Sequence, residues 1–423
     1  MKYLFVHNNF PAQFRHLALH LGADPKNEVR AIGAEGSRPL PGVTLHRYAL
    51  PPGSLAATHP FARRFDGEAR RAEQTLYVAT MLRASGFTPD IVVAHSGWGE
   101  AMPLRAAFPD ARLAVYCEYF YRPRESDVNF DPEFPELGLD GLVGLHARNA
   151  ASLLALADCD LALSPTLWQR STFPAEFRPK IRTVHEGVDT RLVAPDPAAT
   201  LRLDDGTVLR AGEETVTFVA RNLEPLRGYH VFCRALPAIL RERPNARVLV
   251  VGGFDVSYGQ RPPTGESWHR VFLDEVAGEI DLGRVHFLGH LPFARYLDVL
   301  KVSRAHVYLT YPFVLSWSCL EAMATGCAMV ASDTPPVREV IDGRNGLLVP
   351  FHDPAALAGA VTRVLADPER YREMGALARR TVVERYDMAG VCVPEAMRLL
   401  HAPTTLPRRS APPAFEPGLF GAA

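Results

Sequence analysis

Between Tyr311 and Pro350 the chain reads YPFVLSWSCLEAMATGCAMVASDTPPVREVIDGRNGLLVP. A loop leads into an apolar helical stretch, Gly326 ends this helix, and the apolar run Met329–Ala331 follows at once. A helix that ends at a glycine and is followed directly by a short buried strand is typical of a parallel sheet covered by helices. The stretch therefore predicts an α/β fold.

The same alternation of short apolar runs and helical segments extends through most of the chain. It predicts one series of strands at 3–6, 29–32, 91–94, 113–116, 161–163 and 181–184, and a second series at 215–220, 247–251, 285–288, 305–309 and 329–331. After the second series the pattern becomes helical. We expect an N-terminal Rossmann-like domain over 1–190, a linker or domain edge over 191–214, a second Rossmann-like domain over 215–385, a C-terminal helix over 386–402 that packs back on the N-terminal domain, and a mobile tail over 403–423.

The composition is that of a protein with a hydrophobic core. The 423 residues are 47% hydrophobic and 22% charged, close to globular averages. The formal net charge of -1 gives no general attraction to nucleic acid. The six cysteines are too scattered for a zinc-ligand set, and the N-terminus turns polar at His7, before the apolar core of a signal peptide develops. We expect a cytoplasmic protein without a membrane span or a nucleic-acid partner.

The start of the helix after Tyr311 is a candidate anion site. Backbone N–H groups at Ser316, Trp317 and Ser318 are expected to point at an anion, because the first N–H groups of a helix have no partner within it. Glu321, one turn further on, is placed to accept hydrogen bonds from vicinal hydroxyls. The alternative is that Glu321 only supports the first turn of its own helix.

Two arginines lie near the carboxyl end of the strand expected at 215–220. Arg221 follows this strand, and Arg227 precedes the next helical segment. Guanidinium groups placed beside a helix N-terminus are suited to bidentate binding of a diphosphate. The alternative is a pair of solvated loop arginines.

Glycines mark the ends of the next two strands. Gly252 and Gly253 end the strand expected at 247–251, where the absence of Cβ allows a ligand to approach the backbone. Leu288 precedes another glycine at the end of the following strand, where a nucleobase is expected to meet backbone groups. Plain turns are the alternative at both places.

The order of these motifs resembles that of the retaining glycosyltransferases of family 4, which have the GT-B fold of two Rossmann-like domains facing an interdomain cleft. The resemblance rests on the basic pair, the glycine pair, the strand ending in Leu-Gly, the segments LEAMATG and REVIDGRNGLLVP, and the segment HEGVD at 185–189, and it spans roughly residues 1–400. It implies a donor site in the second domain. Its residues would be Arg221, Arg227 and Ser316 to Ser318 for the diphosphate, and Glu321, Gly252, Gly253 and Leu288 for the nucleoside.

One position departs from the family. The usual signature has two glutamates separated by seven residues, but the residue eight positions before Glu321 is Phe313. The first glutamate of the family normally faces the donor sugar. The departure therefore implies an atypical donor or, as an alternative, a protein that binds a nucleotide sugar without turnover.

The first domain is expected to hold the acceptor. His95 follows the strand at 91–94, and the resemblance places a histidine near the transferred sugar, where its imidazole or its backbone carbonyl would stabilise the positive charge of the reacting sugar. A structural loop histidine is the alternative. Two loops, after the first strand and within 116–127, supply further groups expected to face the sugar or the acceptor, namely Asn8, Asn9, Phe10, Gln13 and Glu118. Family members often have two glycines where this chain has Ala12 and Gln13.

These expectations combine into one activity. We expect a retaining glycosyltransferase that moves a sugar from a nucleotide-diphosphate sugar to a glycan, a lipid-linked acceptor or another hydroxyl. No DxD-type acidic pair stands out at a strand end, so we expect cationic groups to replace the divalent metal, with no cofactor.

Other activities and locations stay open at this point. An epimerase or phosphorylase of the same fold and a non-catalytic nucleotide-sugar-binding protein are alternatives, whereas a dehydrogenase is disfavoured because no GxGxxG opens a strand–helix turn. Arginines at 63, 64, 70 and 71 form either a solvated helix face or a patch for anionic lipid. Peripheral contact with the inner face of the membrane therefore remains an alternative to a purely cytoplasmic location.

Overall fold

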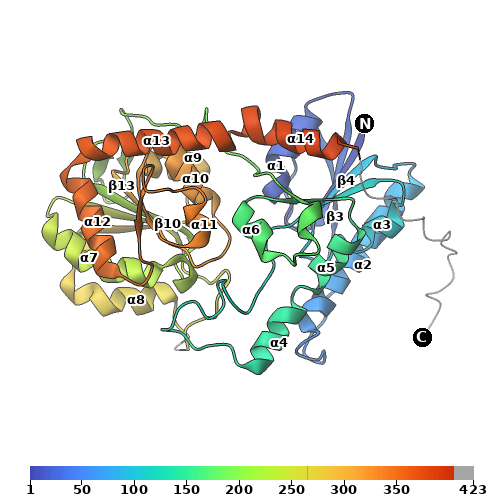
Figure 1. Cartoon of the computed structure of the whole chain (residues 1–423), viewed down its shortest axis with the longest axis horizontal. Coiled ribbons are helices and arrows are strands. Elements are labelled where there is room, and N and C mark those ends of the chain that lie inside the picture. Colours follow the sequence, from blue (N-terminus) through green and yellow to red (C-terminus); the bar gives the residue numbers. More distant parts are fainter. Residues whose placement is uncertain (264, 404–423) are drawn as a thin grey trace. The chain divides into compact units, whose positions relative to one another are not determined.

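The computed structural model describes residues 1–263 and 265–403, which divide into two compact units. The first unit comprises 1–123, 137–186 and the chain from 393 on, and the second comprises 124–136 and 187–392. Each unit has a parallel sheet flanked by helices (Figure 1), which confirms the α/β prediction. All but the first residue of the expected tail lie outside the described residues.

The sheet of the first unit is parallel throughout and has the strand order β3-β2-β1-β4-β5-β6-β7. Its strands are β1 (Lys2–Val6), β2 (Glu28–Ala34), β3 (Val43–Tyr48), β4 (Ile91–His95), β5 (Arg112–Tyr116), β6 (Leu161–Ser164) and β7 (Ile181–Thr183). β1 and β4 are central and almost fully buried, which explains their unbroken apolar runs. The sequence pattern does not predict β3, because this edge strand is mostly half exposed and carries polar residues.

The sheet of the second unit is also parallel, with the order β12-β11-β10-β13-β14-β15. Its strands are β10 (Thr215–Asn222), β11 (Arg247–Gly253), β12 (Val285–Gly289), β13 (Ala305–Tyr308), β14 (Ala328–Ser332) and β15 (Leu347–Val349). The segment expected as a linker carries an antiparallel hairpin, β8 (Thr200–Arg202) and β9 (Val208–Arg210). Leu201 and Leu209 of this hairpin are buried against β11, so the hairpin belongs to the core of the second unit.

Helices are the other main elements of both units. Those of the first unit are α1 (Arg15–Gly22), α2 (Arg63–Ala84), α3 (Leu104–Ala107), α4 (Leu139–Ala147), α5 (Ala150–Asp158), α6 (Leu167–Thr172) and α14 (Val393–His401). Those of the second unit are α7 (Tyr229–Glu242), α8 (Trp268–Val276), α9 (Phe293–Lys301), α10 (Trp317–Ala324), α11 (Pro335–Arg338), α12 (Pro354–Ala366) and α13 (Pro368–Tyr386). Short 3-10 helices include η1 (Ala12–Phe14) and η3 (Pro225–Arg227).

The end of the chain returns to the first unit. A π-helical turn at Met388–Cys392 follows α13, and α14 then packs against α1. Leu399 and Leu400 are buried in the same core cluster as β1, and the Tyr3 hydroxyl lies 2.9 Å from Nε2 of His401. The apolar face of this short helix thereby completes one side of the first unit.

Candidate functional site

The strand order of the second sheet reverses between β10 and β13. In open α/β sheets, ligands bind outside the carboxyl ends of the strands at such a point. Arg221 and Asn222 end β10, and Thr310 and Tyr311 follow β13. Arg221 is exposed, whereas Asn222 is buried and donates to Oγ of Ser257 at 2.7 Å. The candidate donor site is therefore built at this edge.

Arg227 is held in a fixed position at the same edge. Its Nη1 donates to Oγ1 of Thr310 at 2.9 Å and to the carbonyl of Val314 at 3.0 Å. Gly228 follows with a φ of +67°, and a Cβ there would lie 2.4 Å from Cβ of Leu309, so this close approach requires glycine. Arg227 itself is 7% exposed, and its Nε and Nη2 make no hydrogen bond to a described residue. The guanidinium thus presents two unused nitrogens.

An aromatic pair lies next to this guanidinium. The rings of Tyr258 and Phe313 meet edge to face with centroids 4.9 Å apart, and the guanidinium carbon of Arg227 lies 5.9 Å from each centroid. Phe313 is 2% exposed. Where the family signature has a carboxylate, this chain therefore has a buried aromatic ring.

Glu224 is a site residue that the motif spacing does not reveal. Its buried carboxylate accepts backbone N–H groups from Ser257, Tyr258 and Gly259 at 3.2 to 3.4 Å. Burial raises the pKa of Glu224, and these hydrogen bonds only partly offset that effect. The carboxylate fixes the loop that carries Tyr258. Glu224 and this loop are distant in sequence, so only the folded chain brings them together.

The start of α10 differs from the expectation. The N–H of Ser316 donates to the hydroxyl of Tyr308 at 2.9 Å, so this N–H is engaged by the protein itself and is not directed at an anion. The hydroxyls of Ser316 and Ser318 lie 2.8 Å apart, and Trp317 is 45% exposed. Tyr308 at the end of β13 thus positions the first turn of the helix.

Glu321 lies in the second turn of α10 and is largely buried. Its Oε2 accepts a hydrogen bond from the Tyr296 hydroxyl of α9 at 2.7 Å. Burial raises the pKa of Glu321, and the hydrogen bond from Tyr296 counteracts part of this rise. A carboxylate held in this way is suited to accept hydrogen bonds from ligand hydroxyls. The sequence pattern gave no signal for Tyr296.

The three remaining donor-site candidates, Gly252, Gly253 and Leu288, lie close to other parts of the second unit. A Cβ on Gly253 would lie 2.4 Å from both Oδ1 of Asn222 and Nε2 of His290, and one on Gly252 would lie 2.7 Å from a backbone oxygen of β10. Leu288 packs against the core cluster that the β8–β9 hairpin completes. The protein's own atoms lie where a Cβ on either glycine would be, which explains glycine at both places, and the contact of these three residues with a nucleoside stays a prediction.

The first sheet also reverses its strand order, between β1 and β4. His7 follows β1 and His95 ends β4, so both lie at the edge where the ligands of α/β proteins bind. Their rings are 5.1 Å apart, and each residue is 4% exposed. His95 is placed as expected. His7 was missed, although its position directly after a buried strand is a signal of the same kind.

Glu118 and Gln13 accompany His95. Nε2 of Gln13 donates to Oε1 of Glu118 at 2.9 Å, and Oε2 of Glu118 lies 3.4 Å from Nε2 of His95. The structure therefore brings three of the predicted residues together. The interaction of Glu118 with His95 suggests that the carboxylate orients the ring.

The first loop holds the other three candidates. Phe10 is completely buried among Phe5, Phe14 and their neighbours, so its ring packs in the core and does not face a sugar, contrary to the expectation. The carbonyl of Asn8 accepts a backbone N–H from β2, whereas Asn9 is exposed. The apolar ring of Phe10 thus anchors a loop whose polar residues remain near the surface.

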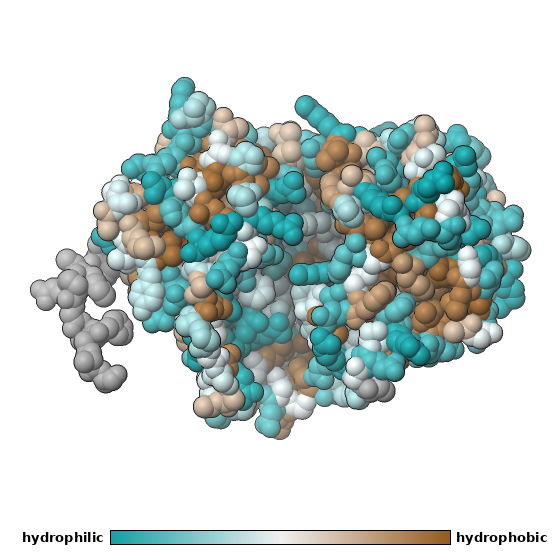
Figure 2. All heavy atoms as spheres, turned by 180° about the vertical axis from the view of Figure 1, so that it is seen from behind, coloured by the Kyte–Doolittle hydropathy of each residue, from teal (hydrophilic) through white to brown (hydrophobic). Residues whose placement is uncertain are grey.

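The basic face of α2 is engaged within the first unit. Arg63 bonds to the Thr58 carbonyl, and Arg64 bonds to Glu68. Arg70 bonds to Asp66, and Arg71 bonds to the Trp98 carbonyl. None of the described helices combines the length and apolar character that crossing a bilayer requires. On the face drawn in Figure 2, hydrophilic and hydrophobic residues are interspersed.

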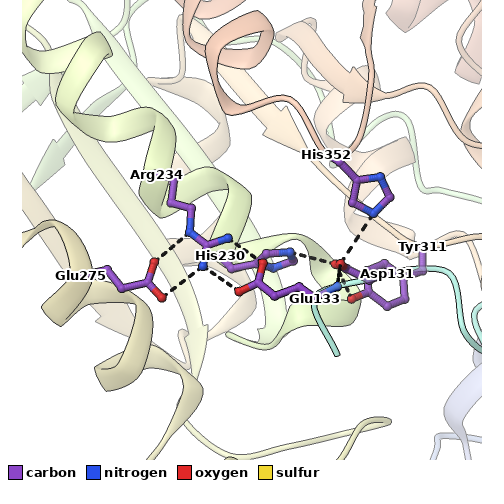
Figure 3. A network of polar contacts seen from close by, with 7 residues as sticks. All are labelled: Asp131, Glu133, His230, Arg234, Glu275, Tyr311 and His352. Carbon is purple, nitrogen blue, oxygen red and sulfur yellow. Dashed lines mark hydrogen bonds and ion pairs between the residues drawn. The ribbon is translucent and has the colours of Figure 1, made fainter. Parts of the chain in front are cut away.

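One cluster of the second unit combines side chains of the types that bind metal ions. Ligand atoms of Asp131, Glu133 and His230 lie within 4.8 Å of one another. Nε2 of His230 lies 2.9 Å from Asp131, and Arg234 contacts Glu133 at 2.6 Å. Both contacts are drawn in Figure 3. The Tyr311 hydroxyl donates to the same Asp131 oxygen at 2.7 Å. The carboxylates are thus paired with donors of the chain itself, and the cluster anchors residues 124–136 to the second unit.

The two parallel-sheet units and the site at the edge of the second define a protein of the GT-B class. Residues 25–193 match the family described as "Glycosyl transferase family 4 group", and residues 213–367 match "Glycosyl transferases group 1". The chain belongs to the glycosyltransferases of family 4. The family resemblance found in the motifs is therefore confirmed.

Relatives agree with this assignment. A D-inositol 3-phosphate glycosyltransferase of Nocardia farcinica is 34% identical over 202 residues, which are 47% of this chain and 42% of the relative. A GDP-mannose-dependent alpha-(1-6)-phosphatidylinositol monomannoside mannosyltransferase of Mycolicibacterium smegmatis is 28% identical over 248 residues, 54% of this chain and 59% of the relative. The chain thus spans about half the length of these two relatives.

Solved structures share the fold. The sucrose-phosphate synthase of Thermosynechococcus elongatus superposes with a TM-score of 0.69 at 19% identity, covering 94% of this chain and 98% of the other. Anabaena Alr3699/HepE, solved in complex with UDP and glucose, superposes with a TM-score of 0.66 at 17% identity. This superposition covers 94% of this chain and 99% of the other. These similarities confirm the GT-B architecture.

Proposed function

We propose that this protein transfers a sugar from a nucleoside-diphosphate sugar to a hydroxyl acceptor, with retention of anomeric configuration and without a metal ion. The acceptor is a glycan, a lipid-linked compound or another polyol. Family membership supports the reaction class, and the names of the relatives, which include inositol 3-phosphate and phosphatidylinositol glycosyltransferases, support a polyol-type acceptor.

The observation that carries the proposal is the state of Arg227. A cationic side chain that is 7% exposed, held through one nitrogen, leaves two nitrogens without a partner among the described residues. A largely buried cation is stabilised by an anion that completes its hydrogen bonds. A diphosphate bound by Arg227 and Arg221 satisfies this requirement and stabilises the negative charge that develops as the leaving group departs.

Glu321 supports a nucleoside as the other part of the ligand. Its Oε2 is bonded to Tyr296, and Oε1 has no hydrogen-bond partner among the described residues. A carboxylate oxygen that is free to accept at a largely buried position is suited to a ribose hydroxyl. Diphosphate and ribose binding together account for a nucleotide sugar as donor.

The first experiment is a thermal-shift screen with UDP, GDP, ADP and TDP and their common sugar conjugates. A ligand present at 100 times its Kd stabilises the protein by about 2.7 kcal/mol. We expect one base to stabilise the wild type and Glu321→Ala to abolish the effect, whereas Glu369→Ala, at an exposed carboxylate paired with Arg372, retains it. The absence of a shift with every nucleotide would contradict a nucleotide-sugar site.

Turnover with the stabilising donor then tests the reaction. We expect release of the nucleoside diphosphate to require an acceptor and to continue in EDTA, and proton NMR of the product to show the anomeric configuration of the donor. Interconversion of free donor sugars without an acceptor would instead indicate an epimerase. Binding without any turnover would indicate a nucleotide-sugar-binding protein, an outcome that Phe313 in the signature position makes worth testing.

A further inference from the structure

Residues 124–136, here called the strap, belong to the second unit although the chain on both sides of them belongs to the first. The first unit includes the chain up to Pro123 and resumes at Leu137. The strap lies between β5 and α4 and contains none of the described strands or helices. Its position on the second unit therefore depends on the contacts of its side chains.

Two aromatic rings of the strap pack on the second unit. The ring of Phe130 lies 5.0 Å from that of Tyr311, measured between centroids. The ring of Phe134 meets those of His230 and Trp268 edge to face, at 5.6 and 5.4 Å. Aromatic side chains bury large apolar areas and prefer such geometries. The strap is thus fixed at two places, four residues apart.

Asp131 lies between these rings and forms the polar centre of the contact. Its Oδ2 accepts the hydroxyl of Tyr311 at 2.7 Å and lies 2.9 Å from Nε2 of His230. Both bonds are drawn in Figure 3, and Asp131 and Tyr311 are 5% and 7% exposed. A hydrogen bond to an ionised carboxylate is stronger than one between neutral groups. The strap therefore holds the Tyr311 side chain firmly.

Tyr311 belongs to the loop after β13 that also holds Arg227. The residue before it, Thr310, accepts Nη1 of Arg227 at 2.9 Å, and the carbonyl of Val314 accepts the same nitrogen at 3.0 Å. The N–H of Tyr311 itself donates to the carbonyl of Leu226 at 3.0 Å. The strap and the guanidinium are thus bonded to one short loop.

We propose that Asp131 is a positioning residue for the donor: through the Tyr311 hydroxyl, the strap holds the loop after β13 in the arrangement that fixes Arg227. The inference rests on the proposed binding of a donor diphosphate by Arg227. A guanidinium that is fixed in advance loses less freedom when the ligand binds, so its affinity is higher. Because coupling is reciprocal, donor binding strengthens the docking of the strap by the same factor.

Tyr311→Phe tests this route because it removes the hydroxyl and retains the ring. We expect the Kd of the nucleoside diphosphate to rise about fivefold, as for the loss of one hydrogen bond, while the acceptor KM changes less than twofold. Asp131→Ala should raise the Kd by a similar factor. The double variant should be no weaker than either single variant, because both changes remove the same interaction. Calorimetric titration measures each Kd.

Two controls separate positioning from a general loss of stability. Tyr3→Phe removes another buried hydroxyl, which lies 2.9 Å from Nε2 of His401 in the first unit. Glu133→Gln weakens a strap contact that does not involve Tyr311, the ion pair with Arg234. Both controls should keep the Kd within twofold of the wild type. An equal rise in either control, an unchanged Kd in Tyr311→Phe, or additive effects in the double variant would overturn the proposal.

Proteolysis reads the docking of the strap in the wild type as well. Glutamyl endopeptidase cleaves after Glu133 only when this residue leaves Arg234, so the rate follows the fraction of undocked strap. We expect saturating nucleoside diphosphate to slow this cleavage about fivefold in the wild type and less than twofold in Tyr311→Phe. Equal slowing in both proteins, or none in the wild type, would overturn the proposal. If thermal denaturation shows that Tyr311→Phe does not fold, the wild-type result decides.

Failure of the proposed function gives a different result. If no nucleoside diphosphate binds the wild type, that function is contradicted, and inorganic pyrophosphate becomes the probe of Arg227. Slower cleavage after Glu133 in pyrophosphate, lost in Arg227→Ala, would still support the coupling between the strap and the guanidinium. The absence of this effect would overturn it.

Discussion

The hydroxyl of Tyr296 donates a hydrogen bond of 2.7 Å to Oε2 of Glu321, and both groups are largely buried. This bond joins α9 to α10 and orients a carboxylate that the family associates with the donor ribose. The same burial that prepares Glu321 for a ligand makes its ionised form costly in the empty protein. Ligand binding and stability are therefore opposed at this residue.

The first prediction concerns this opposition. Burial raises the pKa of Glu321 in the folded state, so the stability that this group contributes is present at low pH and is lost as pH rises through the folded pKa. We expect Glu321→Gln to stabilise the empty protein by about 1 kcal/mol at pH 8 and by much less at pH 4, while donor affinity falls at least tenfold. Thermal denaturation at both pH values and calorimetric titration measure these effects. A less stable variant at pH 8 would contradict the argument.

Arg227 supplies the second prediction. Lysine carries the same charge but lacks the planar fork that bonds simultaneously to Thr310, to the Val314 carbonyl and to a ligand. We expect Arg227→Lys to raise the donor KM about tenfold, the loss of one charge-assisted hydrogen bond. Steady-state kinetics measures this change. Arg284→Lys, at an arginine that bonds to carbonyls in the last turn of α7 and just after it, is the control and should leave the donor KM unchanged. Equal effects at both arginines would contradict a specific role.

Asp131 supplies the third prediction. Burial alone would raise its pKa, but hydrogen bonds from His230, Tyr311 and a backbone N–H outweigh burial and bring the pKa to about 2. A carboxyl whose pKa is lower in the folded than in the unfolded state stabilises the fold at pH values above its unfolded pKa of about 3.9. This stabilisation is lost as the pH falls toward 2. We expect Asp131→Asn to cost about 2 kcal/mol at pH 7 and progressively less below pH 4. Urea unfolding of the full chain at pH 7 and pH 3 measures the difference.

The control for Asp131 is an exposed carboxylate with an arginine partner. Asp342→Asn removes such a group, and its expected effect is below about 1 kcal/mol because surface pairs contribute little. The docking of residues 124–136 gives a second readout, since limited proteolysis of this segment should accelerate in Asp131→Asn. A cost at Asp131 that does not decline with pH would show that its charge is not the stabilising feature.

Ala12 supplies the fourth prediction. Its φ of +38° lies in the left-handed region, which costs a residue with a Cβ about 1–2 kcal/mol. We expect Ala12→Gly to raise the free energy of unfolding by about 0.5 kcal/mol, because relief of strain exceeds the entropy that glycine loses on folding. Ala18→Gly, at a buried position of α1, should lower it by about 1 kcal/mol or more. Chemical denaturation compares the two, and a destabilised Ala12→Gly would contradict the strain.

The sequence by itself determined the α/β architecture of both units and placed the candidate donor-site residues of the second. Short apolar runs bounded by glycine and polar residues identify buried parallel strands, because such strands are apolar on both faces. Arg227 and Glu321 follow strand ends or helix starts directly, so their positions relative to the sheet edge are encoded locally. The same reasoning placed His95 at the edge of the first sheet.

Only the tertiary structure decided which groups share a site. His7 meets His95 because the register of two strands distant in sequence aligns them, and Glu224 reaches the loop at 257–259 because β10 and β11 pair. Phe10 was misread because its burial depends on neighbours supplied by other strands. Local patterns report the preferences of each segment, whereas burial, pKa and hydrogen-bond partners are properties of the assembled contacts.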